Sequence, residues 1–288
     1  MTEAQRVKQF NKILFRWQKT HYRDMPWRPA YGDPKPFDPY RILVSEIMLQ
    51  QTQVDRVREK YAAFMKEFPT VRKLAAAPLS QVLGLWSGLG YNRRAKYLHE
   101  CARIVVCDHG GKFPSTYEEL VALPAIGRST AGALLAFSFG QDTPMIDTNI
   151  RRMLVRVFFK EAIPSDKELY EFAMSIIPKG KGRLWNYAML DIGAALCTAR
   201  NHSDACPFIP LHGEVEDFVY KKPQAKFKGS NRFYRGRIMK YLLEYGPSTK
   251  AKTMKELGFT AITFETALAS LLKEKLVILK RGTLTVAT

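Results

Sequence analysis

Hydrophobic residues recur every three or four positions through the first two thirds of the chain, the spacing that buries one face of an α-helix. The spacing is clear in FNKILFRW (10–17), YRILVSEIMLQ (40–50) and VDRVREKYAAFMKEF (54–68). Convincing β alternation is absent there, and proline or glycine, which end helices, separates the helical stretches. These breaks fall at Pro69, Pro78, Gly88–Gly90, Gly110–Gly111 and Pro124. The pattern predicts an all-α domain of many short helices over residues 1–215.

The pattern changes near residue 216. Eight Lys or Arg and no acidic residue lie between Lys221 and Lys240, with Phe227, Phe233 and Tyr234 among them, so we expect a basic linker over 216–232. Helical spacing returns in RGRIMKYLLEY, TKAKTMKELG and TFETALASLLKEKL, and LVILKRGTLTV then predicts two strands around a glycine turn. Three helices followed by a hairpin are typical of a winged helix, which we predict over 233–288. Winged helices bind DNA or other proteins, and both uses stay open, with DNA modestly favoured.

The charge balance indicates a polyanionic partner. The chain has 45 Lys and Arg against 27 Asp and Glu, a net charge of +18, which favours nucleic acid binding, although an inert basic surface gives the same balance. Charges interrupt the N-terminal segment MTEAQRVKQFNKILFRW, so it is no secretory signal, and no apolar run approaches the roughly 20 residues that span a bilayer. Four cysteines make no disulfide framework. We expect an intracellular, cytoplasmic or nucleoid-associated protein with reduced thiols.

The stretch LPAIGRSTAG (123–132) breaks one helix and begins another within a few residues. The first helix is expected to end at Leu123 and Pro124, and Gly127 to take a backbone conformation that other residues avoid. Ser129 or Thr130 would then start the next helix. Such a helix-hairpin-helix exposes unpaired backbone N–H groups that suit a phosphate oxygen. An ordinary tight connection between packed helices has the same sequence features.

Two carboxylates lie in positions that suit chemistry. Asp147, in PMIDTNIRR, would in isolation be a helix N-cap. Glu46 lies on an otherwise apolar helix, where burial raises the pKa of a carboxyl and allows it to act as a general acid. The alternative for Glu46 is a partly exposed glutamate paired with one of the many arginines.

Several segments in order resemble the catalytic domain of the MutY adenine DNA glycosylases, of the helix-hairpin-helix (HhH-GPD) base-excision superfamily. They are PWR (26–28), PYRILVSEIMLQQTQV (39–54), LAAAPLSQVLGLWSGLGYNRRAKYLH (74–99), GGKFPSTYEELVALPAIGRSTAGALLAFSFG (110–140) and DTNIRRMLVR (147–156). The resemblance implies a mainly α DNA glycosylase fold of two helical subdomains with a cleft between them. A six-helix barrel would occupy about 34–141, and residues 1–33 with 142–215 would form the second subdomain.

The resemblance also implies roles for individual residues. Glu46 would protonate the departing adenine, Asp147 would stay ionised and stabilise the positive sugar, and Asn149 would help to orient the site. The extruded base would lie against Trp27, Arg28, Ser129 and Tyr187, while Gln51 and Tyr91 would enter the base stack. For Trp27 and Tyr91 the alternative is burial in the core. Phosphate contacts would come from Ala125, Gly127, Ser129, Thr130, Arg93 and Arg94, joined by Lys96, unless the last three form a solvated basic face.

Ser129 decides between two reactions. Bifunctional relatives carry a lysine at this position, whose amine attacks the sugar and leads to strand cleavage. Serine cannot form that imine, so we predict base removal by hydrolysis alone.

The sequence departs from the family near the end of the glycosylase domain. The family usually holds a [4Fe–4S] cluster with four cysteines spaced C-x6-C-x2-C-x5-C. Here LCTARNHSDACPFIPLHG offers only Cys197 and Cys206, so we predict no cluster, no metal and no cofactor, with apolar packing in place of ligation. A zinc site with His202 and His212 would have no standard spacing.

The second and third departures concern substrate choice. A winged helix replaces the Nudix-like domain with which many family members read 8-oxoguanine, and Asn92 and Tyr187 lie where the family varies. The leading hypothesis is a monomeric, monofunctional glycosylase that removes adenine opposite 8-oxoguanine or guanine in double-stranded DNA. A thymine or uracil mismatch glycosylase is the alternative, because related enzymes share the PWR and hairpin motifs. A DNA-binding protein with a decayed site is a third hypothesis, against which Glu46 and Asp147 argue.

Overall fold

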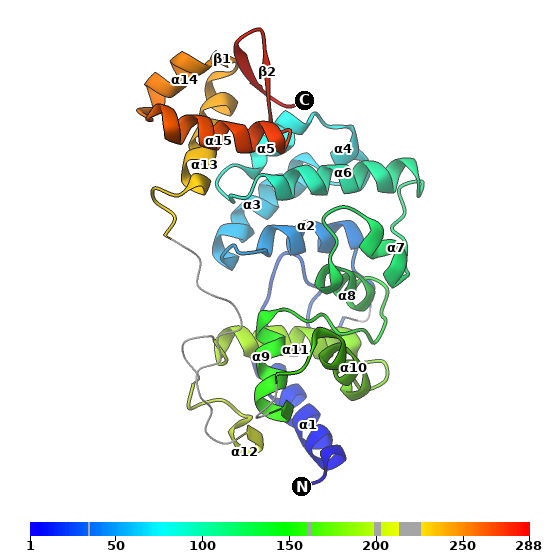
Figure 1. Cartoon of the computed structure of the whole chain (residues 1–288). Helices are drawn as coiled ribbons and strands as arrows, with labels where there is room; N and C mark the ends of the chain where they lie inside the picture. The colour runs from blue at the N-terminus through cyan, green and yellow to red at the C-terminus, as the bar shows by residue number, and fades with distance from the viewer. Residues whose placement is uncertain (34, 160–162, 199–202, 213–225) are drawn as a thin grey trace. The chain divides into compact units, whose positions relative to one another are not determined.

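The computed structural model describes residues 1–33, 35–159, 163–198, 203–212 and 226–288 (Figure 1). Residues 216–225 of the predicted basic linker, with Lys221 and Lys222, lie outside the described residues, as does His202. Helices make up most of the described chain, which confirms the mainly α prediction. No helix among the described residues combines the length and apolarity needed to cross a membrane.

The described chain forms two compact units, each built from segments that are distant in sequence. Unit 1 combines Met1–Glu46, Pro114–Ala122 and the described part of Ile126–Lys222, and unit 2 combines Ile47–Phe113, Leu123–Ala125 and the described part of Pro223–Thr288. The subdomain and linker boundaries drawn from the sequence stay predictions.

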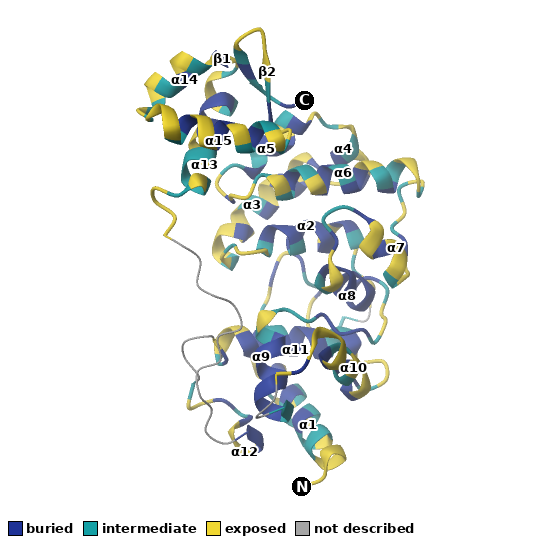
Figure 2. Ribbon diagram, viewed as in Figure 1, coloured by how far each residue is buried: buried dark blue, intermediate teal, exposed yellow. Residues whose placement is uncertain are grey.

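The elements of unit 1 are α-helical except for one π-helical turn, η1. They are α1 (Glu3–His21), most of α2 (Pro39–Leu49), α7 (Tyr117–Ala122), α8 (Arg128–Phe137), α9 (Thr148–Leu154), η1 (Val155–Phe159), α10 (Asp166–Ile176), α11 (Gly182–Ala195) and α12 (Ile209–His212). Helix α1 begins with a capping box between Thr2 and Gln5. Its apolar face meets α11 in a core that includes Phe10, Leu14 and Trp185. Both α9 and α11 are largely buried in Figure 2.

Close backbone packing fixes the segment that leads to Asp147. A Cβ on Gly132 of α8 would lie 2.4 Å from the Pro144 carbonyl oxygen, so only glycine fits there. The buried Asn186 side chain of α11 accepts from the Met145 N–H at 2.8 Å and donates to the Thr143 carbonyl at 2.9 Å. These contacts hold residues 143–145 between α8 and α11.

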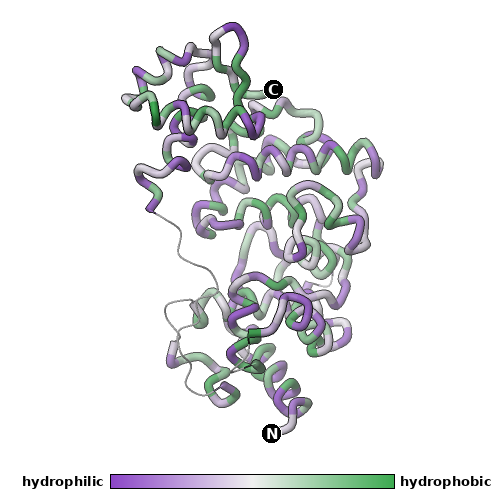
Figure 3. Tube along the Cα trace, viewed as in Figure 1, coloured by the Kyte–Doolittle hydropathy of each residue, from purple (hydrophilic) through white to green (hydrophobic). Residues whose placement is uncertain are grey.

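Unit 2 contains the remaining helices and the three strands of the described chain. They are the end of α2, α3 (Val54–Glu67), α4 (Val71–Ala76), α5 (Leu79–Trp86), α6 (Arg93–Cys107), α13 (Asn231–Tyr245), β1 (Ser248–Thr249), α14 (Lys250–Leu257), α15 (Ala261–Lys273), β2 (Val277–Lys280) and β3 (Thr283–Val286). Hydrophilic and hydrophobic residues alternate along α6 (Figure 3), whose apolar face packs against α4 and α5. Phe64 and Trp86 are fully buried in this core, with ring centroids 6.0 Å apart.

The C-terminal residues form the predicted three helices and hairpin. Side chains of Ser230, Thr249 and Thr260 cap α13, α14 and α15 by accepting backbone N–H groups. Strands β2 and β3 pair antiparallel, with Val277 opposite Val286. Short β1, which the sequence pattern does not predict, pairs with β3 and gives the order β1-β3-β2. We call residues 231–286 the C-terminal module.

Candidate active site

Glu46 projects from the apolar helix α2, between Ser45 and Ile47, which are both buried. Its side chain keeps partial solvent access but is deeply set in the protein. Desolvation, reinforced by the negative charge of Asp147, raises the pKa of Glu46 from 4.5 to about 7, although the Arg28 cation opposes the rise. Glu46 can therefore hold a proton near neutral pH.

Asp147 is the N-cap of α9, as expected of an aspartate at the start of a helix. It also lies close enough to Glu46 for its charge to raise the pKa of Glu46. Its Oδ1 atom accepts the Asn149 N–H at 2.9 Å and the Ile150 N–H at 2.7 Å. Burial raises the pKa of Asp147, while these two hydrogen bonds and the charge of Arg152 lower it. The helix N-terminus thus stabilises negative charge on this carboxylate.

Asn149 is held by a network that the sequence analysis missed. Arg152 donates to the Asn149 Oδ1 atom at 2.6 Å and, through Nε, to the Cys197 carbonyl at 2.9 Å. A Cβ on Gly193 would lie 2.9 Å from the Asn149 Cβ, so α11 packs directly against this residue. The network ties the start of α9 to the end of α11.

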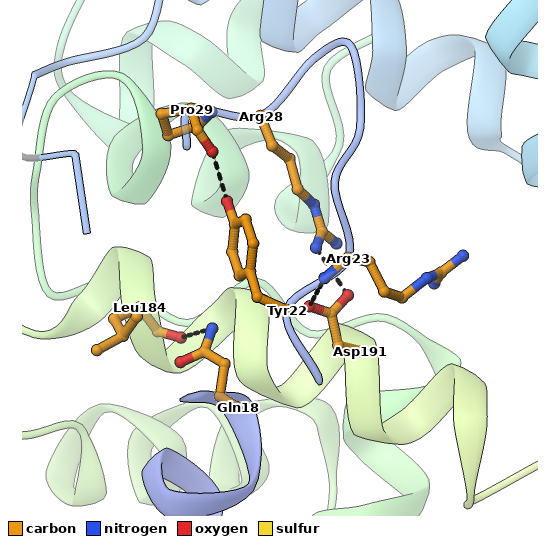
Figure 4. Close-up of polar contacts among 7 residues, drawn as sticks. All are labelled: Gln18, Tyr22, Arg23, Arg28, Pro29, Leu184 and Asp191. Carbon is orange, nitrogen blue, oxygen red and sulfur yellow. Dashed lines mark hydrogen bonds and ion pairs between the residues drawn. The ribbon is translucent and has the colours of Figure 1, made fainter. Parts of the chain in front are cut away.

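A buried ion pair positions Arg28 (Figure 4). Arg28 Nη1 lies 2.7 Å from Asp191 Oδ1, and the two side chains are 7% and 0% exposed. The other Asp191 oxygen accepts the Arg23 N–H at 3.3 Å. Desolvation raises the pKa of Asp191, and the Arg28 charge opposes the rise. Sequence reasoning missed Asp191, although it lies in the same LWNYAMLDIGA stretch as Tyr187, because burial of one acid on a helix leaves no periodic signal.

Tyr187 and Trp27 are both buried, at 3% and 4% exposure. The Tyr187 ring stacks on Phe137 with centroids 4.2 Å apart, and the Arg28 guanidinium lies 4.6 Å from its centroid. The Tyr187 hydroxyl is buried and has no hydrogen-bond partner among the described residues, and burial raises its pKa. Tyr22, whose pKa burial raises to about 12, packs edge-on against Tyr187 and donates to the Pro29 carbonyl at 2.8 Å. Unit 1 therefore gathers Glu46, Arg28 and Tyr187 within electrostatic reach of one another.

The hairpin differs from its prediction at the backbone. Gly127 has φ −96°, an ordinary value for any residue, and it is the N-cap of α8; the prediction of an unusual conformation there was wrong. Ala125 takes the left-handed conformation instead, with φ 68°. A β-carbon crowds this conformation, which is why glycine is the usual occupant. The helix starts at Arg128, so Ser129 lies in its first turn, partly exposed, and Thr130 is buried.

Gln51 and Tyr91 share a strained backbone. Both have positive φ, at 58° and 49°, both are exposed, and both belong to unit 2. Strained non-glycine residues cluster at functional sites. Because Gln51 and Tyr91 are the residues predicted from the sequence to enter the base stack, we call residues 50–53 and 88–91 the two wedge loops. Asn92 follows the second loop as the N-cap of α6.

Arg94 joins the two wedge loops. Its guanidinium donates to the carbonyls of Ile47 at 2.8 Å, Met48 at 3.1 Å and Leu89 at 3.1 Å, and further to Gln50, Gly90 and the Thr52 hydroxyl. Desolvation lowers its pKa to about 10. These bonds support a structural clamp, and the phosphate contact assigned to Arg94 stays a prediction.

Arg93 and Lys96, the cations on either side of Arg94, make different contacts from Arg94. Arg93 is exposed, with its guanidinium 5.7 Å from the Tyr97 ring, and Lys96 donates to the Glu274 carbonyl at 2.9 Å.

The chain is similar in sequence to known DNA repair proteins. The model of the "HhH-GPD superfamily base excision DNA repair protein" family matches residues 44–179. An adenine DNA glycosylase of Mycobacterium tuberculosis is 34% identical over 278 residues, which cover 92% of this chain and 88% of that protein. The chain belongs to the adenine DNA glycosylase family. It is also 40% identical to the human adenine DNA glycosylase over 209 residues, 70% of this chain and 38% of the human protein. The Buchnera aphidicola relative is 39% identical over 74% of this chain and 59% of its own length, so the chain spans well under two thirds of these two relatives.

Solved structures have the same fold. A thermostable thymine-DNA glycosylase superposes with a TM-score of 0.67 at 29% identity, covering 73% of this chain and 96% of that one. An endonuclease III in a non-covalent DNA complex superposes with a TM-score of 0.61 at 22% identity, covering 72% and 95%. The second likeness supports the helix-hairpin-helix fold alone.

In this adenine DNA glycosylase family member, the described residues that follow α11 include two thiols, Cys197 and Cys206, each in contact with another side chain. Cys197 Sγ accepts from Arg156 Nη1 at 3.0 Å, and Cys206 Sγ lies 3.8 Å from His212 Nε2. Burial raises the pKa of Cys206. Phe208, fully buried, stacks on Phe10 with centroids 4.6 Å apart. Among the described residues, no group of three or more His, Cys, Asp or Glu is arranged to hold a metal ion.

Proposed function

We propose that this chain hydrolyses the N-glycosidic bond of adenine mispaired with 8-oxoguanine or guanine in double-stranded DNA. The observation that carries the proposal is the pair of carboxyl groups in unit 1, with Glu46 at a pKa of about 7 beside a hydrogen-bonded Asp147. Glycoside hydrolysis, which also passes through a positive sugar, uses an acid and a carboxylate in the same way.

The surroundings of the two carboxyl groups assign the acid role to Glu46 and the anionic role to Asp147. Burial raises the pKa of both carboxyl groups. Asp147 alone accepts two backbone N–H groups and lies near the Arg152 charge, all of which favour its ionised form, so we assign the proton that the pair retains to Glu46. Glu46 donates this proton to a ring nitrogen of adenine as the bond to C1′ breaks. Adenine leaves as a neutral base, and the Asp147 carboxylate stabilises the cationic sugar electrostatically or covalently. Water then adds at C1′ and gives its proton to the Glu46 carboxylate, which restores the acid and leaves an abasic site.

The base pocket uses Arg28 and Tyr187. The Asp191 ion pair fixes the Arg28 guanidinium beside the Tyr187 ring, and the buried Tyr187 hydroxyl has no hydrogen-bond partner among the described residues. Asp191 acts through Arg28 and is a positioning residue.

The reaction stops at the abasic site. Ser129 carries a hydroxyl where bifunctional relatives carry the Schiff-base amine, so no imine forms and the strand stays intact. Borohydride should trap no covalent complex with wild-type enzyme, and Ser129→Lys supplies the positive control.

The enzyme works without a cluster. Arg156 and His212 interact with the two thiols, and the Phe208–Phe10 stack supports the segment where the family places iron. Purified protein should contain far less than one iron or zinc per chain by elemental analysis.

Thymine or uracil opposite guanine is the alternative substrate, favoured by the likeness to a thymine-DNA glycosylase at 29% identity. Identities of 34% to 40% to adenine DNA glycosylases favour adenine. Single-turnover assays on four duplexes, with adenine opposite 8-oxoguanine or guanine and with thymine or uracil opposite guanine, compare the two. Faster release of thymine or uracil than of adenine would reverse the assignment.

A further inference from the structure

The C-terminal module contacts one of the wedge loops within unit 2. Arg232, in the first turn of α13, donates through Nη1 to the Tyr91 hydroxyl at 2.6 Å. Its guanidinium carbon also lies 5.8 Å from the centroid of the Tyr91 ring. One arginine therefore meets both the edge and the face of the side chain predicted to enter the base stack.

Further contacts within unit 2 hold the C-terminal module next to the Tyr91 loop. Lys96 of α6 donates to the backbone carbonyl of Glu274, at the C-terminal end of α15, and Arg235 forms an ion pair with the Glu274 carboxylate. Helix α13 also packs against α5, the helix that precedes the Tyr91 loop. These contacts hold the start of α13 beside Tyr91.

Helix α15 of the module lacks the positive charges that a DNA-reading helix of a winged helix usually carries. When a winged helix reads DNA, the last helix enters the major groove and its side chains meet phosphates and bases. Helix α15 has a single cation, Lys273 in its last turn, and its first turns expose Ile262 (81%) and Glu265, which pairs with Lys250. Most cations of the module lie on its other elements. They are Arg232, Arg235, Arg237 and Lys240 on α13, Lys250, Lys252 and Lys255 on α14, and Lys280 and Arg281 at the hairpin turn.

We propose that Arg232 is a positioning residue for Tyr91, through which the C-terminal module takes part in base extrusion. The inference rests on the proposed function. The hydrogen bond fixes the orientation of the Tyr91 ring on its strained backbone. The guanidinium also places a positive charge beside the ring, where it can attract a DNA phosphate as the ring enters the stack. The module would thereby support the wedge rather than read sequence through α15.

The test compares Arg232→Ala and Arg232→Lys with Lys240→Ala, which removes the same charge from an exposed position of α13. Extrusion is read from the fluorescence of 2-aminopurine placed beside a non-cleavable 2′-fluoroadenosine opposite 8-oxoguanine, and excision from single-turnover release of ordinary adenine. Loss of a charged hydrogen bond should lower both extrusion and excision about tenfold in Arg232→Ala. Arg232→Lys should recover part of the loss, and Lys240→Ala should stay within about twofold of wild type.

Tyr91→Phe separates positioning from general DNA affinity, because it keeps the ring and removes only the hydroxyl. If Arg232 acts through that hydroxyl, adding Arg232→Ala to Tyr91→Phe costs much less than in the wild-type background. Equal effects of Arg232→Ala and Lys240→Ala, or full additivity with Tyr91→Phe, would overturn the proposal. A wild-type protein that extrudes the base but never releases adenine would count against the proposed function alone, because the fluorescence signal needs no cleavage.

Discussion

Among single residues, Glu46 has the clearest consequence for pH dependence. Its pKa of about 7 means that it is mostly protonated below neutral pH and loses the proton above it. The single-turnover excision rate should therefore fall about tenfold per pH unit well above 7, since only the protonated acid can donate. At low pH the rate should fall again as Asp147 gains a proton.

Glu46→Gln removes the transferable proton and should lower the excision rate by about 10² to 10⁴ while abolishing the alkaline decline. A rate profile of wild type that stays flat from pH 6 to 9 would exclude Glu46 as the acid.

The same carboxyl should make stability depend on pH. Because its folded pKa lies above the ordinary 4.5, stability is fully present below pH 4.5 and is lost as pH rises through about 7. The rise corresponds to roughly 3 kcal/mol of unfolding free energy lost well above pH 7. Glu46→Gln, which never ionises, should be more stable than wild type at pH 8.5 and similar at pH 4.5, as measured by denaturant unfolding. If Glu46→Gln and wild type had equal unfolding free energies at both pH 4.5 and pH 8.5, the burial of a charge at this position would be contradicted.

Ala125 stores backbone strain in the hairpin. The left-handed conformation of an alanine costs about 1–2 kcal/mol, which a glycine avoids. Part of this gain is lost, because glycine has more conformational freedom in the unfolded chain. Ala125→Gly should therefore raise the unfolding free energy by about 0.5–1 kcal/mol. Gly127→Ala, at an ordinary φ, is the matched control and should give no gain. A destabilised Ala125→Gly would show that the left-handed conformation is not the one in solution.

For single residues, the sequence suggested two candidate carboxyl groups and misjudged the local geometry of the hairpin. Glu46 stands out as a carboxyl on an otherwise apolar helix, whereas the role predicted for Asp147 came from the family resemblance and not from its helix-capping position. By contrast, the choice between Ala125 and Gly127 for the left-handed residue depends on where α8 starts, and Asp191 is recognised only when α11 meets the 22–28 segment.

Among the elements, the wedge loops depend on one side chain more than on their own sequence. Arg94 donates to the carbonyls of Gln50 and Leu89, one in each loop, whereas adjacent Arg93 is exposed. Arg94→Ala should lower the unfolding free energy by about 2–4 kcal/mol, because several buried carbonyls lose their donor. Arg94→Lys should restore little, since one ammonium cannot span the same acceptors.

Arg93→Ala is the control for the clamp. It should leave stability unchanged, weaken binding to every duplex, and reduce the slope of log affinity against log salt by about 1. The reverse result, with Arg93 needed for stability and Arg94 only for affinity, would refute the clamp.

Helix periodicity predicted the C-terminal helices and hairpin well, because alternation and a glycine turn are local signals. It missed β1, whose two residues are too short for any pattern and are fixed by pairing with β3. It also missed the π-helical turn η1, which continues α9 without a break in composition.

For the chain as a whole, the sequence gives the fold class more readily than the division into units. The units interleave at Glu46, Phe113, Ala122 and Ala125, so a boundary crosses both α2 and the hairpin. Such boundaries come from tertiary contacts, which leave no shift in composition along the chain. The net charge of +18, in contrast, follows directly from the composition, and it agrees with a DNA substrate.

The Asp147→Asn variant tests the proposed adenine excision most directly. Asparagine still accepts the two N–H groups of α9, so the helix cap and the fold should survive, while the negative charge proposed to stabilise the sugar is lost. On adenine opposite 8-oxoguanine, under single-turnover conditions with saturating enzyme, the excision rate should fall about a thousandfold or more, with duplex affinity kept within about threefold. An Asp147→Asn variant that removes adenine at the wild-type rate would contradict the proposed mechanism.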